Sequence, residues 1–244
     1  MRSANDRDGD WHFDESGTGC GVTPRIEMGS SATESLLIRH ECAGPMRARL
    51  RNATNDVHLR LHRLPPFAAL VTGELTVSGY AALLGRMYGF HAPLERSLEA
   101  VFAAANGAPP YHITPVARAN AFLLRTDLLD LGVSEAEADA LPQCETLPSL
   151  ATMEQRAGCL YVIEGARLGG AAMANALDYL LGSERRACRQ FLSGQLDPDP
   201  MPWPHFCRWL EAMAEHADQS AIIASARHTF EAMEQWLSQD DGHV

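Results

Sequence analysis

Apolar residues recur at helical spacing along most of this chain, and we find no convincing run of the alternating β-branched residues that marks a strand. Prolines, glycines and small polar residues at the ends of the periodic segments supply the expected helix starts and stops. The pattern predicts helices over about 45–62, 77–105, 114–131, 149–181, 184–192, 203–216 and 219–237, with a short helix after Ser134. Thr76 should cap the second helix, Pro93 should bend it, and Leu64-Pro65-Pro66 should stop the first. Ser134 and Glu137 resemble a capping box.

These elements predict one all-α domain over residues 44–239, followed by a short tail at 240–244. Residues 1–43 differ from the rest, because they are rich in Gly, Ser, Asp and Thr and lack a sustained period. We expect them to form a flexible N-terminal arm that contributes little to function.

Composition narrows the functional classes. A net charge of −11 argues against nucleic acid or an anionic membrane as the main partner. The sequence has neither the roughly 20-residue apolar run of a membrane span nor an apolar stretch near Met1 like that of a secretory signal. The scattered cysteines form no C-x-x-C pair, so we expect reduced thiols and a cytoplasmic location. They are Cys20, Cys42, Cys144, Cys159, Cys188 and Cys207.

Glycines inside the segment 149–181 are the most informative feature of the chain. Each glycine within a helix costs about 1 kcal/mol relative to alanine. Gly165 and Gly169 lie four residues apart and therefore share a face, with Gly170 beside them. The face without side chains could accept either a second helix or a flat ligand, and the segment alone leaves both open. It is not a phosphate loop, since no G-x-G-x-x-G or G-K-S/T motif is present.

The first predicted helix carries Arg51 and His58 on one stripe, about 10 Å apart along the axis. A cation two turns from an imidazole fits a macrocycle whose metal binds the imidazole and whose carboxylates reach the cation. His58 and His62 also form H-x-x-x-H, a spacing that can bind zinc. Leu59 replaces the glutamate of zinc proteases, which weakens that interpretation. An ordinary hydrogen-bonded surface histidine is the remaining alternative.

Other chemistries find little support. No Ser-His-Asp order and no activated cysteine can be recognised. Glu154 and Glu164 lack the partners of a di-iron site. The basic cluster Arg185, Arg186 and Arg189 is typical of a solvated surface, with docking of an acidic redox partner as the less favoured alternative.

The segment Leu50-Arg51-Asn52-Ala53-Thr54-Asn55-Asp56-Val57-His58 resembles the first-helix pattern L-K/R-x-A-T-x-x-x-H of haem oxygenases. Gly165-Ala166-Arg167-Leu168-Gly169-Gly170 resembles the G-x-x-x-G-G pattern of their distal helix. Two further segments, 88–95 and 161–165, are similar to the bacterial branch that supplies biliverdin to bacteriophytochromes. The resemblance covers about residues 46–237, and the order and separation of the motifs make it fairly specific.

The resemblance implies that haem lies between the first helix and the glycine-bearing helix. His58 would be the proximal iron ligand. Gly165 and Gly169 would be the catalytic distal wall. The cofactor-binding residues would be Arg51, Thr54, Gly165, Gly169, Gly170, Arg208 and Phe230, with the match of Arg208 to a propionate partner and of Phe230 to the haem edge being looser. Ala166 departs from animal members, which have Asp there, so other groups must organise the distal water.

The implied activity is oxidative cleavage of haem, as both cofactor and substrate, by O2 and external electrons. The products would be biliverdin, carbon monoxide and ferrous iron. A ferredoxin or a flavoprotein reductase would supply electrons, and a bacteriophytochrome could receive biliverdin. The main alternative is a non-catalytic haem sensor or carrier on the same fold. A second alternative is the related thiaminase-like and pyrroloquinoline-quinone fold without haem, which would leave Arg51 and His58 without a joint role.

Overall fold

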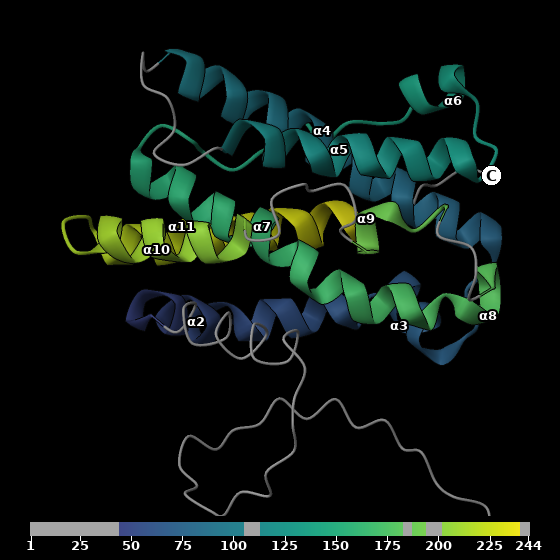
Figure 1. Ribbon diagram of the computed structural model, residues 1–244, viewed down its shortest axis with the longest axis horizontal. Helices are drawn as coiled ribbons and strands as arrows, with labels where there is room; N and C mark the ends of the chain where they lie inside the picture. Colours follow the sequence, from purple (N-terminus) through teal and green to yellow (C-terminus); the bar gives the residue numbers. More distant parts are fainter. Residues whose placement is uncertain (1–43, 105–112, 183–186, 194–201, 240–244) are drawn as a thin grey trace, which may run out of the picture.

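A computed structural model describes residues 44–104, 113–182, 187–193 and 202–239, without the side chains of 113–119, 167–172, 175 and 202 (Figure 1). These parts are helical and contain no strand, as the sequence pattern predicts. The helices are α2 (Pro45–His62), α3 (Pro65–Thr72), α4 (Val77–Ala104), α5 (Ile113–Asp130), α6 (Glu135–Asp139), α7 (Met153–Ala176), α8 (Asp178–Leu181), α9 (Gln190–Ser193), α10 (Pro202–Ala214) and α11 (Gln219–Leu237). The expected arm 1–43 and tail 240–244 lie outside the described residues.

Helix α11 is the centre of the packing, because it lies against both α7 and α2 (Figure 1). Helices α4 and α5 pack against each other, and α9 fills the space between α5 and α7. One continuous hydrophobic core joins these elements through side chains such as Leu50, Leu84, Leu123, Leu160 and Leu210, all fully buried. Helices α2 and α7 are therefore joined to each other mainly through α10 and α11, each of which contacts both.

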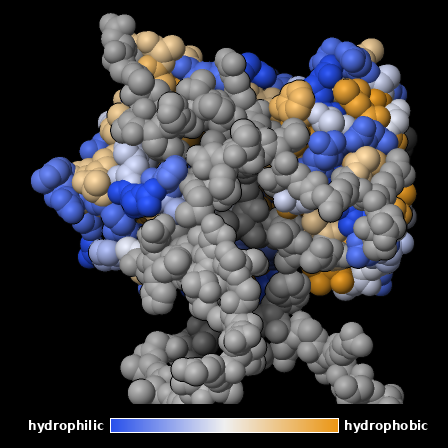
Figure 2. All heavy atoms as spheres, viewed as in Figure 1, coloured by the Kyte–Doolittle hydropathy of each residue, from blue (hydrophilic) through white to orange (hydrophobic). Residues whose placement is uncertain are grey.

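The visible surface is mixed. In Figure 2, hydrophobic and hydrophilic residues are interspersed over the described part of this face. The large hydrophobic residues with exposed side chains come from different helices, and they are Leu59, Val71, Val77, Phe122, Met153 and Tyr179. No helix among the described residues is long and apolar enough to traverse a bilayer.

Several predicted ends are confirmed by their hydrogen bonds. The Thr76 hydroxyl accepts from the Gly79 N–H at 3.0 Å, which caps α4. Ser134 and Glu137 form the predicted capping box of α6. Helix α2 has the predicted bounds, with Pro45 in its first turn. The cysteines of the described residues, Cys144, Cys159, Cys188 and Cys207, are buried free thiols.

Three predicted elements need correction. Leu64-Pro65-Pro66 ends α2 but also begins α3, because proline fits the first position of a helix. The segment 149–181 is not one helix: α7 ends at Ala176, where the Arg189 guanidinium donates to the Ala174 carbonyl at 2.8 Å. The predicted helix 184–192 is helical over only the second half of its described part, which is 187–192. There Cys188 has a φ of 68°, and helix begins only at Gln190.

Candidate functional site

One face of α2 is buried in the core, and this fixes the directions in which the remaining faces of the helix point. Its buried residues recur at helical spacing and are Met46, Leu50, Thr54, Val57 and Leu61. The Glu211 carboxylate of α10 accepts hydrogen bonds from the N–H groups of Met46 and Arg47 at 3.1 and 2.9 Å. These two N–H groups, in the first turn of α2, have no acceptor within the helix itself. Arg47, Arg51 and His58 therefore lie on the flank of a helix that is held by its buried face and by Glu211 at its first turn.

His58 lies half-buried on this flank and contacts two rings. Its imidazole meets the Phe230 ring edge-on, with centroids 5.8 Å apart, and its Nε2 lies 3.3 Å from Nε2 of His62. Burial, together with the nearby His62 and Arg51, lowers the pKa of His58 to about 4. The ring is therefore neutral at neutral pH, which is the form that can bind a metal. Two of the predicted site residues, His58 and Phe230, are thus in contact.

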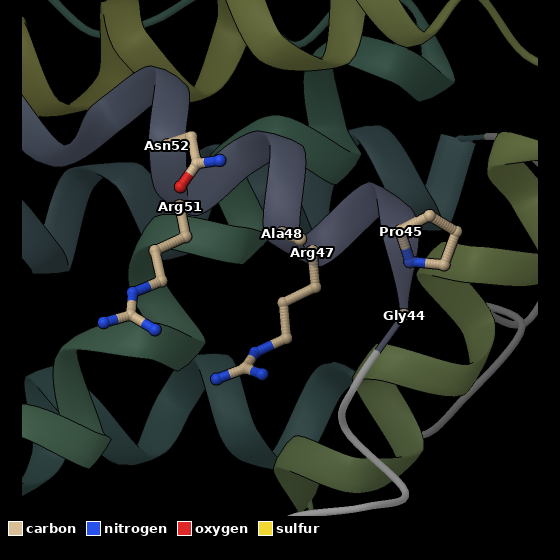
Figure 3. Close-up of a pocket in the computed structure, with 6 residues that line it drawn as sticks. All are labelled: Gly44, Pro45, Arg47, Ala48, Arg51 and Asn52. Carbon is tan, nitrogen blue, oxygen red and sulfur yellow. The ribbon is translucent and has the colours of Figure 1, made fainter. Parts of the chain in front are cut away.

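A pocket of about 350 Å³ opens at the first turns of α2. Its lining residues are Gly44, Pro45, Arg47, Ala48, Arg51 and Asn52. Figure 3 shows the side chains of Arg47 and Arg51 reaching from α2 in the same direction. Two guanidinium groups one turn apart form a site suited to carboxylates, which they can bind through charge-assisted hydrogen bonds. Arg47 was not predicted, although its spacing of four from Arg51 was visible in the sequence.

Trp203 connects this pocket to the glycine-bearing helix. The Arg47 guanidinium lies 5.9 Å from the centre of the Trp203 ring, and Tyr161 of α7 lies 6.0 Å from the same ring. Burial raises the pKa of Tyr161, whereas its hydrogen bond with Thr54 and the charges of Arg47 and Arg51 act in the opposite direction. The predicted residues Arg51 and Thr54 therefore share one neighbourhood with α7. Trp203 and Tyr161 gave no distinguishing signal in the sequence.

The glycines of α7 have two different environments. A Cβ atom at Gly158 would lie 2.7 Å from both the Ala226 nitrogen and the Ser225 Cβ of α11, so this glycine permits close helix packing. A Cβ at Gly165 would have only ordinary contacts with the Trp203 ring, at 3.8 Å or more. Packing among the described residues thus requires a glycine at 158 but not at 165, which favours the ligand explanation for Gly165.

The remaining predicted site residues are Gly169, Gly170 and Arg208, none of which is among the described residues that line the pocket at α2. Gly169 and Gly170 belong to α7, but what surrounds them lies outside the described residues. Arg208 is exposed on α10 and does not line the pocket. The described residues contain no cluster of three or more His, Cys, Asp or Glu side chains that could hold a metal ion.

A buried polar cluster lies elsewhere in the core, between α4 and α5. His91 Nδ1 is 3.9 Å from Glu95 Oε1, and Glu95 Oε2 accepts from the Ala121 N–H at 3.2 Å. His91 and Asn120 are fully buried, and their side-chain nitrogen and oxygen atoms have no hydrogen-bond partner among the described residues. Burial lowers the pKa of His91 to about 4. The spacing of four between His91 and Glu95 was the only signal of this cluster in the sequence.

Comparison with known protein families identifies a family whose model matches this chain. The model of the family described as "Heme oxygenase" matches residues 45–239, which is nearly all of the described chain. A comparison with curated proteins found no match.

Proposed function

The chain belongs to the haem oxygenase family, and from this membership we propose that it cleaves haem with O2 and external electrons to biliverdin, carbon monoxide and ferrous iron. The observation that carries the proposal is the arrangement around α2. A neutral, half-buried His58 and a pair of arginines lie on one flank of this helix, and Trp203 links the arginines to the glycine face of α7.

His58 is the proposed iron ligand. Its neutral imidazole offers a lone pair at Nε2, and the edge of Phe230 restricts how the ring can turn. The Nε2 atoms of His58 and His62 lie 3.3 Å apart, so binding of iron at His58 would require the two rings to separate. The contact is longer than a typical hydrogen bond, and its loss costs little.

Arg51, with Arg47 one turn before it, is proposed to bind the haem propionates. Guanidinium groups pair with carboxylates in a fixed, often bidentate geometry, so these contacts would orient the macrocycle as well as hold it. Thr54 would act indirectly, through its hydrogen bond with Tyr161. Arg208 is a less direct candidate, because it does not line this pocket.

Gly165, Gly169 and Gly170 are proposed to form the distal wall. The bound haem supplies both the iron at which O2 is reduced and the meso carbon that is oxidised. Ala166, next to Gly165, has no side-chain acid with which to donate a proton to bound oxygen. A wall made of backbone leaves room for oxygen close to the macrocycle, so that the haem itself is attacked.

We further propose that this chain belongs to the bacterial biliverdin-producing branch and acts in the cytoplasm. A ferredoxin or a flavoprotein reductase would supply the electrons, and a bacteriophytochrome would receive the biliverdin. The support is the sequence of Tyr88–Glu95 and Tyr161–Gly165. The first of these segments includes the buried pair His91 and Glu95.

The test is a turnover experiment with the purified full chain. Haem is added with ascorbate in air, with catalase present to remove free hydrogen peroxide, and absorption spectra are followed. An oxygenase loses the haem Soret band and gains a bile-pigment band, while the same mixture without oxygen stays unchanged. A chain that keeps the ferrous haem spectrum would be the non-catalytic sensor or carrier.

A further inference from the structure

His58 and His62 form a pair of nitrogen atoms with the geometry of a metal chelate. The residues lie one turn apart on α2, and their Nε2 atoms converge to 3.3 Å, with ring centroids 4.5 Å apart. Two Zn–N bonds of about 2.0–2.1 Å that meet at the tetrahedral angle span about 3.3–3.4 Å between the nitrogens. One metal ion could therefore bind both nitrogens with little movement of either ring.

The pair is held by a well-packed helix. Val57 and Leu61, which precede the two histidines, are 0% and 6% exposed, so α2 cannot turn without losing core contacts. The rings of Phe230 and Phe67 lie beside the two imidazoles, with centroid distances of 5.8 Å to His58 and 6.3 Å to His62. Such packing limits the rotamers available to each imidazole, and this reduces the entropy lost when a ligand binds.

The surroundings leave space for the rest of a coordination shell. His58 is half-buried, whereas His62 is exposed, so water can reach the side of the pair that faces solvent. No third protein ligand is present within the described residues. A two-histidine site completed by water binds exchangeable metal and is unlike a closed structural zinc site.

We propose that the haem-free chain binds one divalent transition-metal ion between His58 and His62. Imidazole nitrogen selects zinc, copper, nickel or cobalt over magnesium and calcium, which prefer oxygen ligands. Among these ions affinity should follow the general order, with copper the strongest. The absence of a glutamate after His58 argues against the zinc-protease chemistry of this spacing but does not affect chelation.

A consequence rests on the proposed function. If His58 Nε2 binds haem iron, the same atom cannot bind a second metal, so the two ligands exclude each other. His62 then affects haem loading without binding haem, because it is needed only for the competing ion. Metal bound at the pair would keep the haem-free protein from accepting haem until the ion dissociates.

The experiment titrates the haem-free full chain with Zn²⁺ by calorimetry and with Cu²⁺ by electron paramagnetic resonance. His62→Ala and His58→Ala should each weaken the strongest Zn²⁺ site at least tenfold and reduce the nitrogen hyperfine coupling of the strongest Cu²⁺ signal from two nitrogens to one. His216→Ala, an exposed histidine after α10, is the matched control and should change neither. Circular dichroism verifies the fold of each variant. Unchanged Zn²⁺ affinity in both pair variants would overturn the proposal.

A second measurement separates this site from the proposed function. With Zn²⁺ at saturation, the wild type should bind haem more weakly, whereas His62→Ala should bind haem equally well with and without zinc. Zinc binding that needs both histidines but does not affect haem would support the metal site. The same result would refute His58 as the iron ligand.

Discussion

The nitrogen of Ala226 lies 2.7 Å from the position that a Cβ atom would take at Gly158, so α7 and α11 touch backbone to backbone at this point. At Gly165, two turns further along α7, the nearest described atom to such a Cβ is in the Trp203 ring at 3.8 Å. Gly158 therefore permits close packing of α7 against α11, whereas Gly165 is not needed for packing among the described residues. Substitution of the two glycines can separate these roles.

Valine at each position should give opposite results. Gly158→Val must displace α11 and should lower the free energy of unfolding by about 1–3 kcal/mol. Gly165→Val should keep its stability and helical circular dichroism, but should weaken haem binding about tenfold, because the side chain enters the space over the macrocycle. Chemical denaturation and haem titration measure the two effects. Unfolding of Gly165→Val without a measurable binding defect would favour helix packing at both glycines.

Replacement of the proposed iron ligand should be visible in the spectrum. His58→Ala should lose the histidine-ligated haem spectrum and most of the turnover, because no other described side chain on this flank of α2 holds the same position. Added imidazole should restore part of both. His62→Ala is the control and should keep both the histidine-ligated spectrum and the turnover. The reverse result, with the loss in His62→Ala alone, would show that the iron ligand is the other histidine.

Arg51→Ala should change which biliverdin isomer forms. A charge-assisted hydrogen bond to a propionate is worth about 1.5–3 kcal/mol, so haem binding should weaken only modestly. If His58 binds the iron as proposed, loss of this contact would let the macrocycle turn about that bond, and a different meso carbon would lie beside the oxygen. Chromatography should show a broader isomer mixture. A single isomer in wild-type yield would assign the orientation to Arg47 or Arg208.

The segment 1–43 is predicted to be dispensable for chemistry. Its composition offers too little apolar surface to order it alone. A shortened chain that begins at Ala43 keeps the start of α2, which Glu211 caps, and should degrade haem at the rate of the full chain. A large loss of turnover in the shortened chain would mean that the arm takes part in the site.

His91 should make the fold sensitive to acid. Its pKa of about 4 in the fold lies below its ordinary value of 6.5, so the unfolded chain binds the proton more tightly. Stability should therefore fall as pH decreases from about 6.5 to 4, by up to about 3 kcal/mol from this group, at 1.36 kcal/mol for each pH unit. A carboxylate at Glu95, whose Oε1 lies 3.9 Å from His91 Nδ1, would reduce the effect.

The control for this effect compares how the free energy of unfolding depends on pH in the wild type and in His91→Gln. Urea denaturation of His91→Gln should show a shallower loss of stability over this range than the wild type. Asp127, whose pKa burial raises to about 6, acts in the opposite direction in both proteins and cancels in the comparison. Identical slopes would contradict a neutral His91 in the folded core.

The helices and the placement of Arg51 and His58 on one flank of α2 could be predicted because both depend on local spacing. Pro45, the Ser134 capping box and the stripe of Arg51 and His58 are all features of neighbouring residues. Contacts between distant segments were not predictable in this way. Trp203 meets Arg47 and the face of Gly165 only through tertiary packing, and Gly158, not the glycine pair of the motif, makes the tight contact with α11.

The break between α7 and α8 has a similar origin. Leu177 has ordinary helical propensity, but Arg189 reaches back to the Ala174 carbonyl and to Asp178, and this ends the helix. The burial of His91 and Asn120 also depends on how α4 meets α5. Such interactions join residues too distant in sequence for a periodic pattern to reveal.

The most direct test of the central claim is the yield of both products from one batch of bound haem. The full chain is loaded with haem and supplied with ascorbate, oxygen and catalase, and biliverdin and carbon monoxide are measured together. A haem oxygenase releases them in equal amounts as haem disappears, and His58→Ala releases almost none. Haem that stays bound and intact, with neither product formed, would contradict the claim and identify a haem carrier or sensor.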